Sequence, residues 1–432
     1  MRTNKKRKKI LKPFFILLII IILLSLTLII YKLLSNNNEQ KLKIKEQETI
    51  NTIKTHYQEN VITNKETELY DSKETKIGKI NKSVNISLED IAIDINTKYF
   101  KIKNLEDIYI KYSDVEPSKE TITLNDRYKK YIPFNQKVKT KDKVSFYDKS
   151  GNYLYTINKS YEFTVIIKDN DYYGIEFANE LLYIKKEDIE SIYDSHNTDL
   201  SNSNGVAVLN YHFFYDENDP EDAKGCQEVI CHSKTQFKTH LDYFKENNIF
   251  TITMNELEMY MDGKLQLPKS VLITIDDGAR TKTGIDMLTE YKMNGTIFLV
   301  TSWYDPKTYY KTDYIELHSH SNNMHNGGKC PGGQGAGIKC LPKETIIEDL
   351  TTSRNLLNNT KAFCYPFYEY NEYAINLLKE VGFTMAFIGE VPTYYGYKLA
   401  EVGADKFKIP RFVIMTHTTM KDIDEYFKEI KN

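Results

Sequence analysis

The sequence predicts an α/β fold, a distorted (β/α) barrel, in the C-terminal half of the 432-residue chain, preceded by two small β-rich repeats and an N-terminal transmembrane helix. Three observations predict this: an uncharged apolar run near the N-terminus, a segment duplicated at an offset of 77 residues, and an alternation of strand-like and helix-like patterns after residue 204. Since domains usually hold roughly 100–200 residues, the chain has room for several units.

The apolar run predicts a membrane anchor. Residues 1–12 carry seven Lys and Arg and no acid, and no charge occurs between Phe14 and Tyr31. Eighteen helical residues span about 27 Å, nearly the hydrocarbon thickness of a bilayer. The basic flank predicts a cytoplasmic N-terminus. A cleaved signal peptide is the alternative, but the run ends without a small-residue cleavage site. We therefore expect a single-pass protein of the cell membrane whose remaining residues lie outside the cytoplasm.

Charge and cysteine content agree with that compartment. Lys and Arg number 58 against 60 Asp and Glu, which excludes the basic excess typical of nucleic-acid-binding proteins. Four of the five cysteines form close pairs, Cys226 with Cys231 and Cys330 with Cys340. Outside the cytoplasm such pairs predict disulfides, with metal sites or free thiols as the alternatives. Cys364 lies inside an apolar run and is expected to be a buried thiol.

The duplicated segment consists of short alternating runs separated by turn signals, a pattern typical of small antiparallel β-barrels. Both copies resemble bacterial SH3-like modules. They could bind cell-wall glycan or serve only as a spacer. Residues of the first copy recur 77 positions later without a gap: Val61 as Val138, Thr63 as Thr140, Tyr70 as Tyr147 and Asp71 as Asp148.

Changes in residue composition along the chain predict where its domains and linkers lie. Turn-prone polar residues mark the linkers, and a polar stretch without Gly or Pro predicts a helical stalk. We expect a cytoplasmic tail over 1–12, an anchor over 13–34, a stalk over 35–60, β repeats over 61–117 and 138–194, linkers over 118–137 and 195–204, and an α/β domain over 205–432.

The last part of the chain alternates short apolar runs with amphipathic helical patterns at 233–247 and 372–381. This alternation implies a parallel sheet or a β/α barrel, in which reactive groups gather at the carboxyl ends of the strands. The expected strands are 206–211, 249–253, 270–275, 296–301, 314–318, 362–367 and 384–388.

The first candidate group is the acidic pair Asp276-Asp277, which follows the apolar strand Val271–Ile275. Two adjacent carboxylates repel each other, and a bound divalent cation would relieve the repulsion while leaving one carboxylate to act as a base. A polar strand end with an Asp-Gly turn is the simpler alternative.

The second group is a histidine cluster. His318, His320 and His325 lie within eight residues of one another, directly after an expected strand. Neutral imidazole is a common zinc ligand, and one Asp with two His leaves coordination positions open for water and substrate. The third group is Tyr365-Pro366-Phe367, where proline ends a strand and could expose backbone N–H groups and aromatic rings.

These groups, in this order, resemble the motifs of the polysaccharide deacetylase family (the chitooligosaccharide deacetylase homology domain, carbohydrate esterase family 4) over about residues 205–432. Thr274–Gly278 is similar to the Thr-Phe-Asp-Asp-Gly motif of the family, and Leu209–Phe213 is like its first strand. His320 and His325 are spaced as in the biofilm poly-N-acetylglucosamine deacetylases, and Tyr365-Pro366-Phe367 looks like the third motif.

The resemblance implies a role for each matching residue. Asp276 is the catalytic base, and Asp277, His320 and His325 bind a divalent metal, zinc or alternatively cobalt, nickel or manganese. The Phe367 backbone N–H contributes to the oxyanion hole, and Tyr365 and Pro366 contact substrate.

The chain departs from the family pattern at two positions. Cys364 replaces the arginine that orients the base, and Arg411 is the candidate substitute. His417 is a candidate general acid, although it could merely precede a capped terminal helix. His318 could compete with His320 for the ligand position, but we expect it to neighbour the ligands without being one.

The function implied is metal-dependent removal of N-acetyl groups from N-acetylglucosamine units of a bacterial cell-surface polymer, either peptidoglycan or poly-N-acetylglucosamine. The alternatives are a wall-binding protein with an impaired deacetylase domain and an O-deacetylase.

Overall fold

The computed structural model describes residues 11–57, 59–89, 99–103, 105–118, 126–195, 202–389 and 396–431. The chain divides into two compact units. One contains residues 1–124, 142–160 and 177–180, and the other contains 125–141, 161–176 and 181–432. Most of the expected basic tail and parts of both expected linkers lie outside the described residues.

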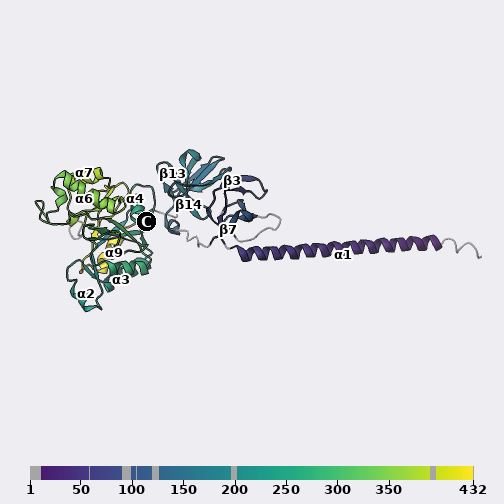
Figure 1. Cartoon of the computed structure of the whole chain (residues 1–432), viewed down its shortest axis with the longest axis horizontal. Helices are drawn as coiled ribbons and strands as arrows, with labels where there is room; N and C mark the ends of the chain where they lie inside the picture. The colour runs from purple at the N-terminus through teal and green to yellow at the C-terminus, as the bar shows by residue number, and fades with distance from the viewer. Residues whose placement is uncertain are drawn as a thin grey trace, which may run out of the picture. The chain divides into compact units, whose positions relative to one another are not determined.

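Helix α1 (Leu11–His56) is the long purple helix of Figure 1. Within the described part of the chain it is the one helix long and apolar enough to cross a membrane, over Phe15–Lys45. Its apolar side chains from Phe15 to Leu34 are exposed. Since an apolar surface of this length is stable only in an apolar medium, α1 has the properties of a membrane anchor or a signal sequence.

The two β-rich segments have matching strands. In the first, β1 pairs with β4 and β7, and in the second, β8 pairs with β11 and β15. The strands are β1 (Asn60–Thr63), β2 (Thr67–Tyr70), β3 (Lys76–Ile80), β4 (Asn85–Ser87), β5 (Tyr99–Lys101), β6 (Tyr109–Lys111), β7 (Val115–Pro117), β8 (Gln136–Thr140), β9 (Val144–Tyr147), β10 (Tyr153–Ile157), β11 (Glu162–Thr164), β12 (Ile167–Lys168), β13 (Tyr172–Phe177), β14 (Glu180–Lys185) and β15 (Ile189–Asp194).

The bounds of β2, β3 and β4 recur 77 residues later as those of β9, β10 and β11. Equivalent core positions are also equally buried, since Val61 and Val138 are both fully buried, as are Ile80 and Ile157. The repeated sequence therefore gives a repeated strand pattern. Its assignment to an SH3-like class stays a prediction.

The α/β part contains a curled parallel sheet in the order β24-β23-β22-β21-β20-β16-β25, with β19 also paired to β20. The α/β class expected from the sequence is confirmed, as a half-barrel. Strand β25 lies in a segment that was not expected to be a strand. The strands are β16 (Ala207–Tyr211), β19 (Phe250–Thr251), β20 (Ser270–Ile275), β21 (Gly295–Leu299), β22 (Ile315–Ser319), β23 (Ala362–Cys364), β24 (Met385–Phe387) and β25 (Phe412–Val413).

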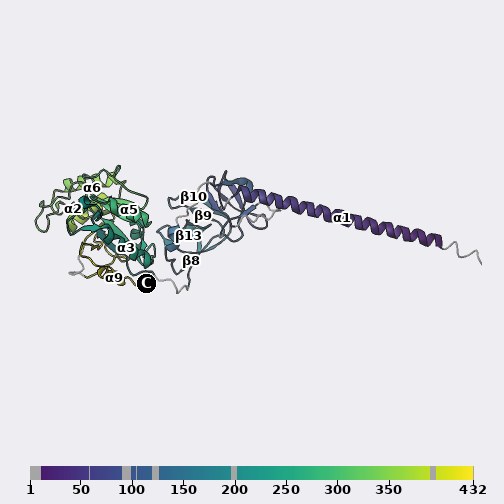
Figure 2. The same cartoon turned by 90° about the horizontal axis from the view of Figure 1, so that it is seen from below.

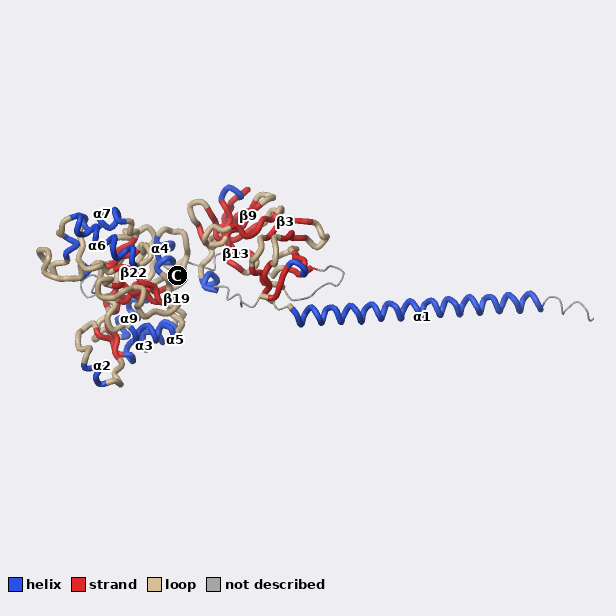
Figure 3. The backbone as a smooth tube through the Cα atoms, in the orientation of Figure 1, coloured by secondary structure: helices blue, strands red, loops and turns tan. Residues whose placement is uncertain are grey.

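Helices cover the outer side of this sheet. Figures 1 and 3 show α6 and α7 together on one side, with α3 and α9 on the other, and in Figure 2, seen from below, α6 again lies apart from α3 and α9. Ser233 caps α3, and Gly382 ends α7 at φ +97°, as the sequence predicts. The helices are α2 (Pro220–Lys224), α3 (Lys234–Glu246), α4 (Met254–Met261), α5 (Lys282–Glu290), α6 (Lys343–Leu356), α7 (Glu372–Val381) and α9 (Met420–Lys428).

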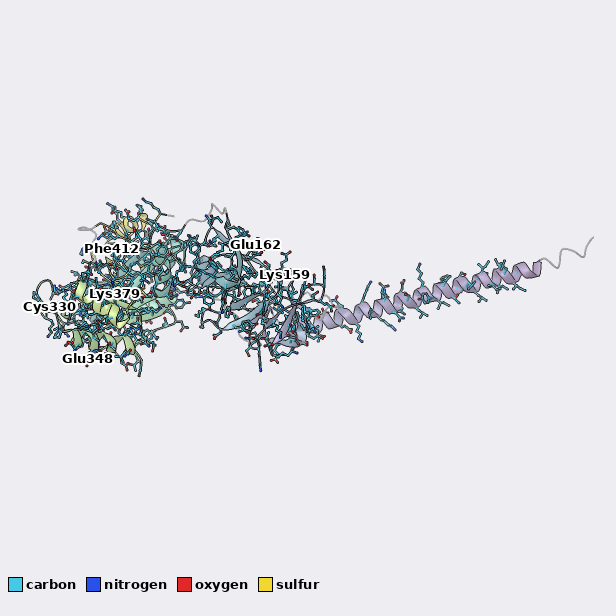
Figure 4. All side chains as sticks on the ribbon, turned by 90° about the horizontal axis from the view of Figure 1, so that it is seen from above. Lys159, Glu162, Cys330, Glu348, Lys379 and Phe412 are labelled. Carbon is cyan, nitrogen blue, oxygen red and sulfur yellow. A yellow bond between two sulfur atoms is a disulfide. The ribbon has the colours of Figure 1, made fainter. Side chains whose placement is uncertain are left out.

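Both expected disulfides are confirmed, Cys226–Cys231 and Cys330–Cys340. Cys330 lies in a loop at the margin of the α/β part (Figure 4). Cys364 is a buried free thiol, as expected.

The inner face of the curled sheet has its own apolar core, closed by α4 and by the segment before β8. Tyr128 packs into this core. Arg127 donates to both carboxylate oxygens of Glu256, at 3.0 and 2.5 Å, and Tyr131 donates to Glu256 at 2.6 Å. Glu256 also forms a capping box with Thr253 at the start of α4. One buried carboxylate therefore ties the segment before β8 to the α/β core.

We predict that Glu256→Ala destabilises the second unit by about 2–4 kcal/mol, because it leaves a half-buried guanidinium and a helix start without their partner. Trp303, the only tryptophan of the chain, lies in this unit, so its fluorescence in urea follows the unit's unfolding. Lys238→Ala, which removes an exposed ion pair with Asp242, is the control and should change stability by no more than about 0.5 kcal/mol. Equal effects of the two substitutions would contradict the prediction.

Candidate active site and metal centre

The acidic pair stands where β20 reaches the carboxyl end of the sheet. Because side chains alternate along a strand, Leu272, Thr274 and Asp276 share the inner face. The backbone then turns sharply, with φ +72° at Asp277 and +94° at Gly278. A Cβ atom at Gly278 would collide with Leu299. Glycine is therefore required here, and the turn directs the two carboxylates to different partners.

Asp276 is fully buried and is held by Arg411, which is also buried. Nη1 and Nη2 of Arg411 lie 2.7 and 2.9 Å from the two carboxylate oxygens. The guanidinium also donates to Thr274 Oγ1 at 3.2 Å, to the Ile388 carbonyl at 2.9 Å and to Cys364 Sγ at 3.0 Å. Burial alone would raise the pKa of Asp276, but the charge of Arg411 lowers it below its usual range, so the carboxyl is ionised at neutral pH.

The strand pairing explains how Arg411 reaches this position. Phe412 pairs with Leu209 of β16, and Ile409 bridges to Phe387 of β24. The segment Ile409–Val413 therefore connects the two ends of the curled sheet, with Arg411 between the two contacts. Its side chain enters the interior, where Asp276 lies.

The second carboxylate faces the histidine cluster. Asp277 Oδ1 lies 3.4 Å from His320 Nε2 and 3.3 Å from His325 Nε2. The Nδ1 atom of His320 lies 2.9 Å from the Cys364 carbonyl, an acceptor that fixes a proton on Nδ1 and leaves Nε2 directed at Asp277. Burial lowers the pKa of His325 to about 4, so its imidazole is neutral at neutral pH.

These three residues fit a divalent cation. Asp277 Oδ1 is buried and has no hydrogen-bond partner among the described residues. In a tetrahedral site with bonds of about 2.0–2.1 Å, two ligand atoms lie roughly 3.3–3.4 Å apart, which is the separation found here. A second cluster, Asp276 with His320 and Cys364, also brings its donor atoms within 4.8 Å of one another. Arg411 already occupies both carboxylate oxygens of Asp276, so the Asp277 cluster is the better candidate.

The third motif is placed differently from the sequence prediction. Tyr365 is fully buried, and its hydroxyl donates to the Phe407 carbonyl at 3.1 Å. Pro366 is buried as well. The Tyr365 ring is therefore not exposed for stacking on a sugar, and the assignment of Tyr365 and Pro366 to substrate binding stays a prediction. They are buried because β23 turns Cys364 inward and the next residue outward, against α6 and α7.

Phe367 does reach the site. Its backbone adopts φ +58°, and its ring lies 4.5 Å from that of His325. A left-handed conformation at a non-glycine residue is uncommon and often marks a functional position. The turn containing the Phe367 N–H thus lies next to the histidine cluster.

Two histidines named from the sequence lie elsewhere. His318 contacts Thr360 Oγ1 at 2.6 Å and lies 3.8 Å from Glu316, so its polar neighbours lie outside the cluster of Asp277, His320 and His325. His417 is exposed in the turn before α9, where Thr419 and Asp422 form a capping box. The structure therefore favours the alternative that His417 only precedes a helix cap.

His212 belongs to the site, although the sequence analysis gave it no role. It follows β16 on the same face as Val208 and Asn210, and its Nε2 lies 3.4 Å from the Tyr368 hydroxyl. Its Nδ1 is buried without a hydrogen-bond partner among the described residues. Burial lowers the pKa of His212, while the charges of Asp276 and Asp277 act to raise it. The period-two alternation that placed Asp276 inward would also have identified His212.

We predict that Asp277→Asn and His325→Ala each abolish stoichiometric metal binding. Either change removes a direct ligand, so affinity should fall by more than the roughly 10–100-fold that loss of an outer hydrogen-bond partner costs. Metal content after dialysis against zinc, measured by mass spectrometry, gives the stoichiometry. His417→Ala is the matched control and should retain about one zinc per chain. Retention of zinc by both ligand variants would place the metal elsewhere.

Residues 264–386 match the family model described as Polysaccharide deacetylase. No curated protein matches the chain by sequence. Among solved structures, a de-N-acetylase from Aggregatibacter actinomycetemcomitans is 20% identical over 51% of this chain and 99% of its own, with a TM-score of 0.43. IcaB from Ammonifex degensii is 19% identical over 52% and 97%, with a TM-score of 0.42. The polysaccharide deacetylase BC0361 from Bacillus cereus is 14% identical over 68% and 91%, with a TM-score of 0.42. The polysaccharide deacetylase match over residues 264–386, which includes Asp276, Asp277, His320 and His325, supports a deacetylase enzyme.

Proposed function

We propose that this enzyme is a metal-dependent hydrolase that removes N-acetyl groups from N-acetylglucosamine units of a cell-surface polysaccharide. The observation that carries the proposal is the separation of the two adjacent carboxylates. Asp276 faces Arg411, while Asp277 faces His320 and His325. Asp276, kept ionised by Arg411 and not needed as a ligand, is thus the proposed base beside a three-ligand site that leaves open positions for water and substrate.

The proposed roles follow from this geometry. Asp276 accepts the proton of the attacking water at a carboxylate oxygen, and Arg411 keeps it ionised and oriented. When bound at Asp277, His320 and His325, the divalent metal, zinc in our proposal, supplies Lewis-acid polarisation and lowers the pKa of water. Cobalt, nickel and manganese accept the same ligands.

The remaining steps need an oxyanion partner and a proton donor. The Phe367 N–H, next to His325, is the proposed donor to the tetrahedral oxyanion. We assign proton donation to the leaving amine to His212, in place of His417, because His212 lies in the site. Asp276 and Asp277 favour its protonated form, although burial lowers its pKa overall. This pathway gives acetate and a free amine.

The N-terminal regions support a location at the cell surface. Helix α1 would anchor the chain in a single pass, with the basic tail cytoplasmic and the enzyme outside. The SH3-like repeats over 61–117 and 138–194 would bind or span wall glycan. The deacetylase domain would occupy 205–432, and its partner is an N-acetylglucosamine polymer, either peptidoglycan or poly-N-acetylglucosamine.

Incubating the purified full-length chain with each polymer tests this function. N-deacetylation releases acetate and creates free amines in equal amounts, and a chelator should stop both. Acetate without new amines would indicate an O-deacetylase. Neither product from either polymer, with metal bound, would indicate a wall-binding protein with an impaired domain.

We predict that Asp276→Asn lowers kcat about 10²–10⁴-fold, the range expected for loss of a general base. Bound metal should remain near the wild-type amount, since Asp277 and the two histidines are unchanged. Amine release and metal content are measured on the same preparation. Asp242→Asn, on α3 and outside the site, should be fully active. An active Asp276→Asn enzyme would exclude this residue as the base.

We also predict that Arg411→Lys moves the acid limb of the kcat/KM profile to higher pH. Arg411 lowers the pKa of Asp276. Lysine cannot make the same bidentate hydrogen bond, so the substitution should raise the pKa of Asp276, and a larger fraction of Asp276 is then protonated at a given acidic pH. At neutral pH we expect a loss of about tenfold. An equal loss of kcat/KM at every pH, with the acid limb at the wild-type position, would show that Arg411 has only a structural role.

A further inference from the structure

Trp303 stands beside the histidine cluster with its side chain in solvent. It lies in the turn after β21 and is 46% exposed. Its ring centroid is 5.3 Å from that of His325, with the two planes at 68°. His325 in turn packs against Phe367 at 4.5 Å. A proposed metal ligand therefore lies between two aromatic rings, one of which is open to solvent.

The turn that carries Trp303 is fixed to the segment between the two histidine ligands. Thr301 N and Ser302 N donate to the carbonyls of Ser321 and Asn322, at 3.2 and 3.0 Å. The Asp349 carboxylate accepts from Asn322 N and Asn323 N, at 2.8 and 2.7 Å. The position of the indole relative to the site is thus set by a hydrogen-bonded framework, as a preorganised binding surface requires.

A single exposed aromatic residue often needs no explanation. Tyr310, on the same loop, is equally exposed at 46%, but its hydroxyl donates to Asp286 at 2.6 Å and Lys282 lies over its ring. The Trp303 indole N–H has no such partner in the described part of the chain. Its one ring contact is with His325, so Trp303 differs from Tyr310 by facing the site.

We propose that Trp303 is the stacking platform for the pyranose ring next to the unit that loses its acetyl group. This inference rests on the proposed function. A pyranose ring offers an apolar C–H face and a polar rim, and an indole presents a large rigid surface at low cost in side-chain entropy. The enzyme therefore acts on units within a chain and binds oligomers better than free N-acetylglucosamine.

The single tryptophan makes binding directly observable. In full-length, zinc-loaded Asp276→Asn protein, in which we expect turnover to be slowed about 10²–10⁴-fold, emission from Trp303 should shift on addition of β-linked N-acetylglucosamine oligomers. The monosaccharide should give a much smaller shift. Emission that stays constant while calorimetry shows oligomer binding would overturn the proposal.

Kinetics provide an independent test. Trp303→Ala should raise KM for oligomers about tenfold with kcat within about twofold, since the lost contact is remote from the reacting bond. Trp303→Phe should restore part of the affinity. For Trp303→Ala, the rate on 4-nitrophenyl acetate, which is too small to span both subsites, should fall much less than the rate on oligomers, and Tyr310→Ala should behave as wild type. An unchanged KM for oligomers, or an equal loss on the ester, would overturn the proposal.

The two proposals fail in different ways. If the enzyme releases acetate and amine but Trp303→Ala has no effect on oligomers, the proposed function stands and the proposed role of Trp303 is wrong. If the chain releases nothing from any glycan but shows the length-dependent fluorescence shift, the proposed deacetylase function is wrong and the proposed binding role of Trp303 stands.

Discussion

The buried ion pair between Arg411 and Asp276 is the constraint on which the site depends. Both side chains are almost wholly removed from water, at 1% and 0% exposure, and each provides the other's compensating charge. A buried pair of this kind adds little net stability, because desolvation offsets the attraction, but loss of one partner is costly. Its main effect here is on ionisation and orientation, since it keeps a carboxylate charged inside an apolar barrel.

The pair also gives two adjacent carboxylates different chemistry. Asp276 continues the inward alternation of β20, whereas the left-handed turn at Asp277 and Gly278 directs the next carboxylate to the histidines. Each acid therefore has its own positive or metal-binding partner, and their mutual repulsion is relieved. Cys364 contacts the partners of both carboxylates. Its Sγ accepts from Arg411 Nη2 at 3.0 Å, and its carbonyl accepts from His320 Nδ1 at 2.9 Å.

Sequence patterns predicted the features that depend on residues close together in the chain. The apolar strand ending in Asp276-Asp277, the caps of α3 and α7, and both disulfides required only short-range signals. Arg411 came from the family resemblance alone, because its contact with Asp276 spans 135 residues and depends on the pairing of β25 with β16. The burial of Tyr365 was not predicted, because a short, uniformly apolar strand does not reveal which face each side chain takes. His212 was overlooked although its alternation with Asn210 was visible.

The central claim is that one cation is held by Asp277, His320 and His325 while Asp276 remains on Arg411. A crystal structure of the zinc-loaded chain, with anomalous diffraction recorded at the zinc edge, tests this most directly. We expect one anomalous peak about 2.0–2.1 Å from these three side chains, with the guanidinium still bound to Asp276. A peak at the alternative cluster of Asp276, His320 and Cys364, with Arg411 displaced, would contradict the account.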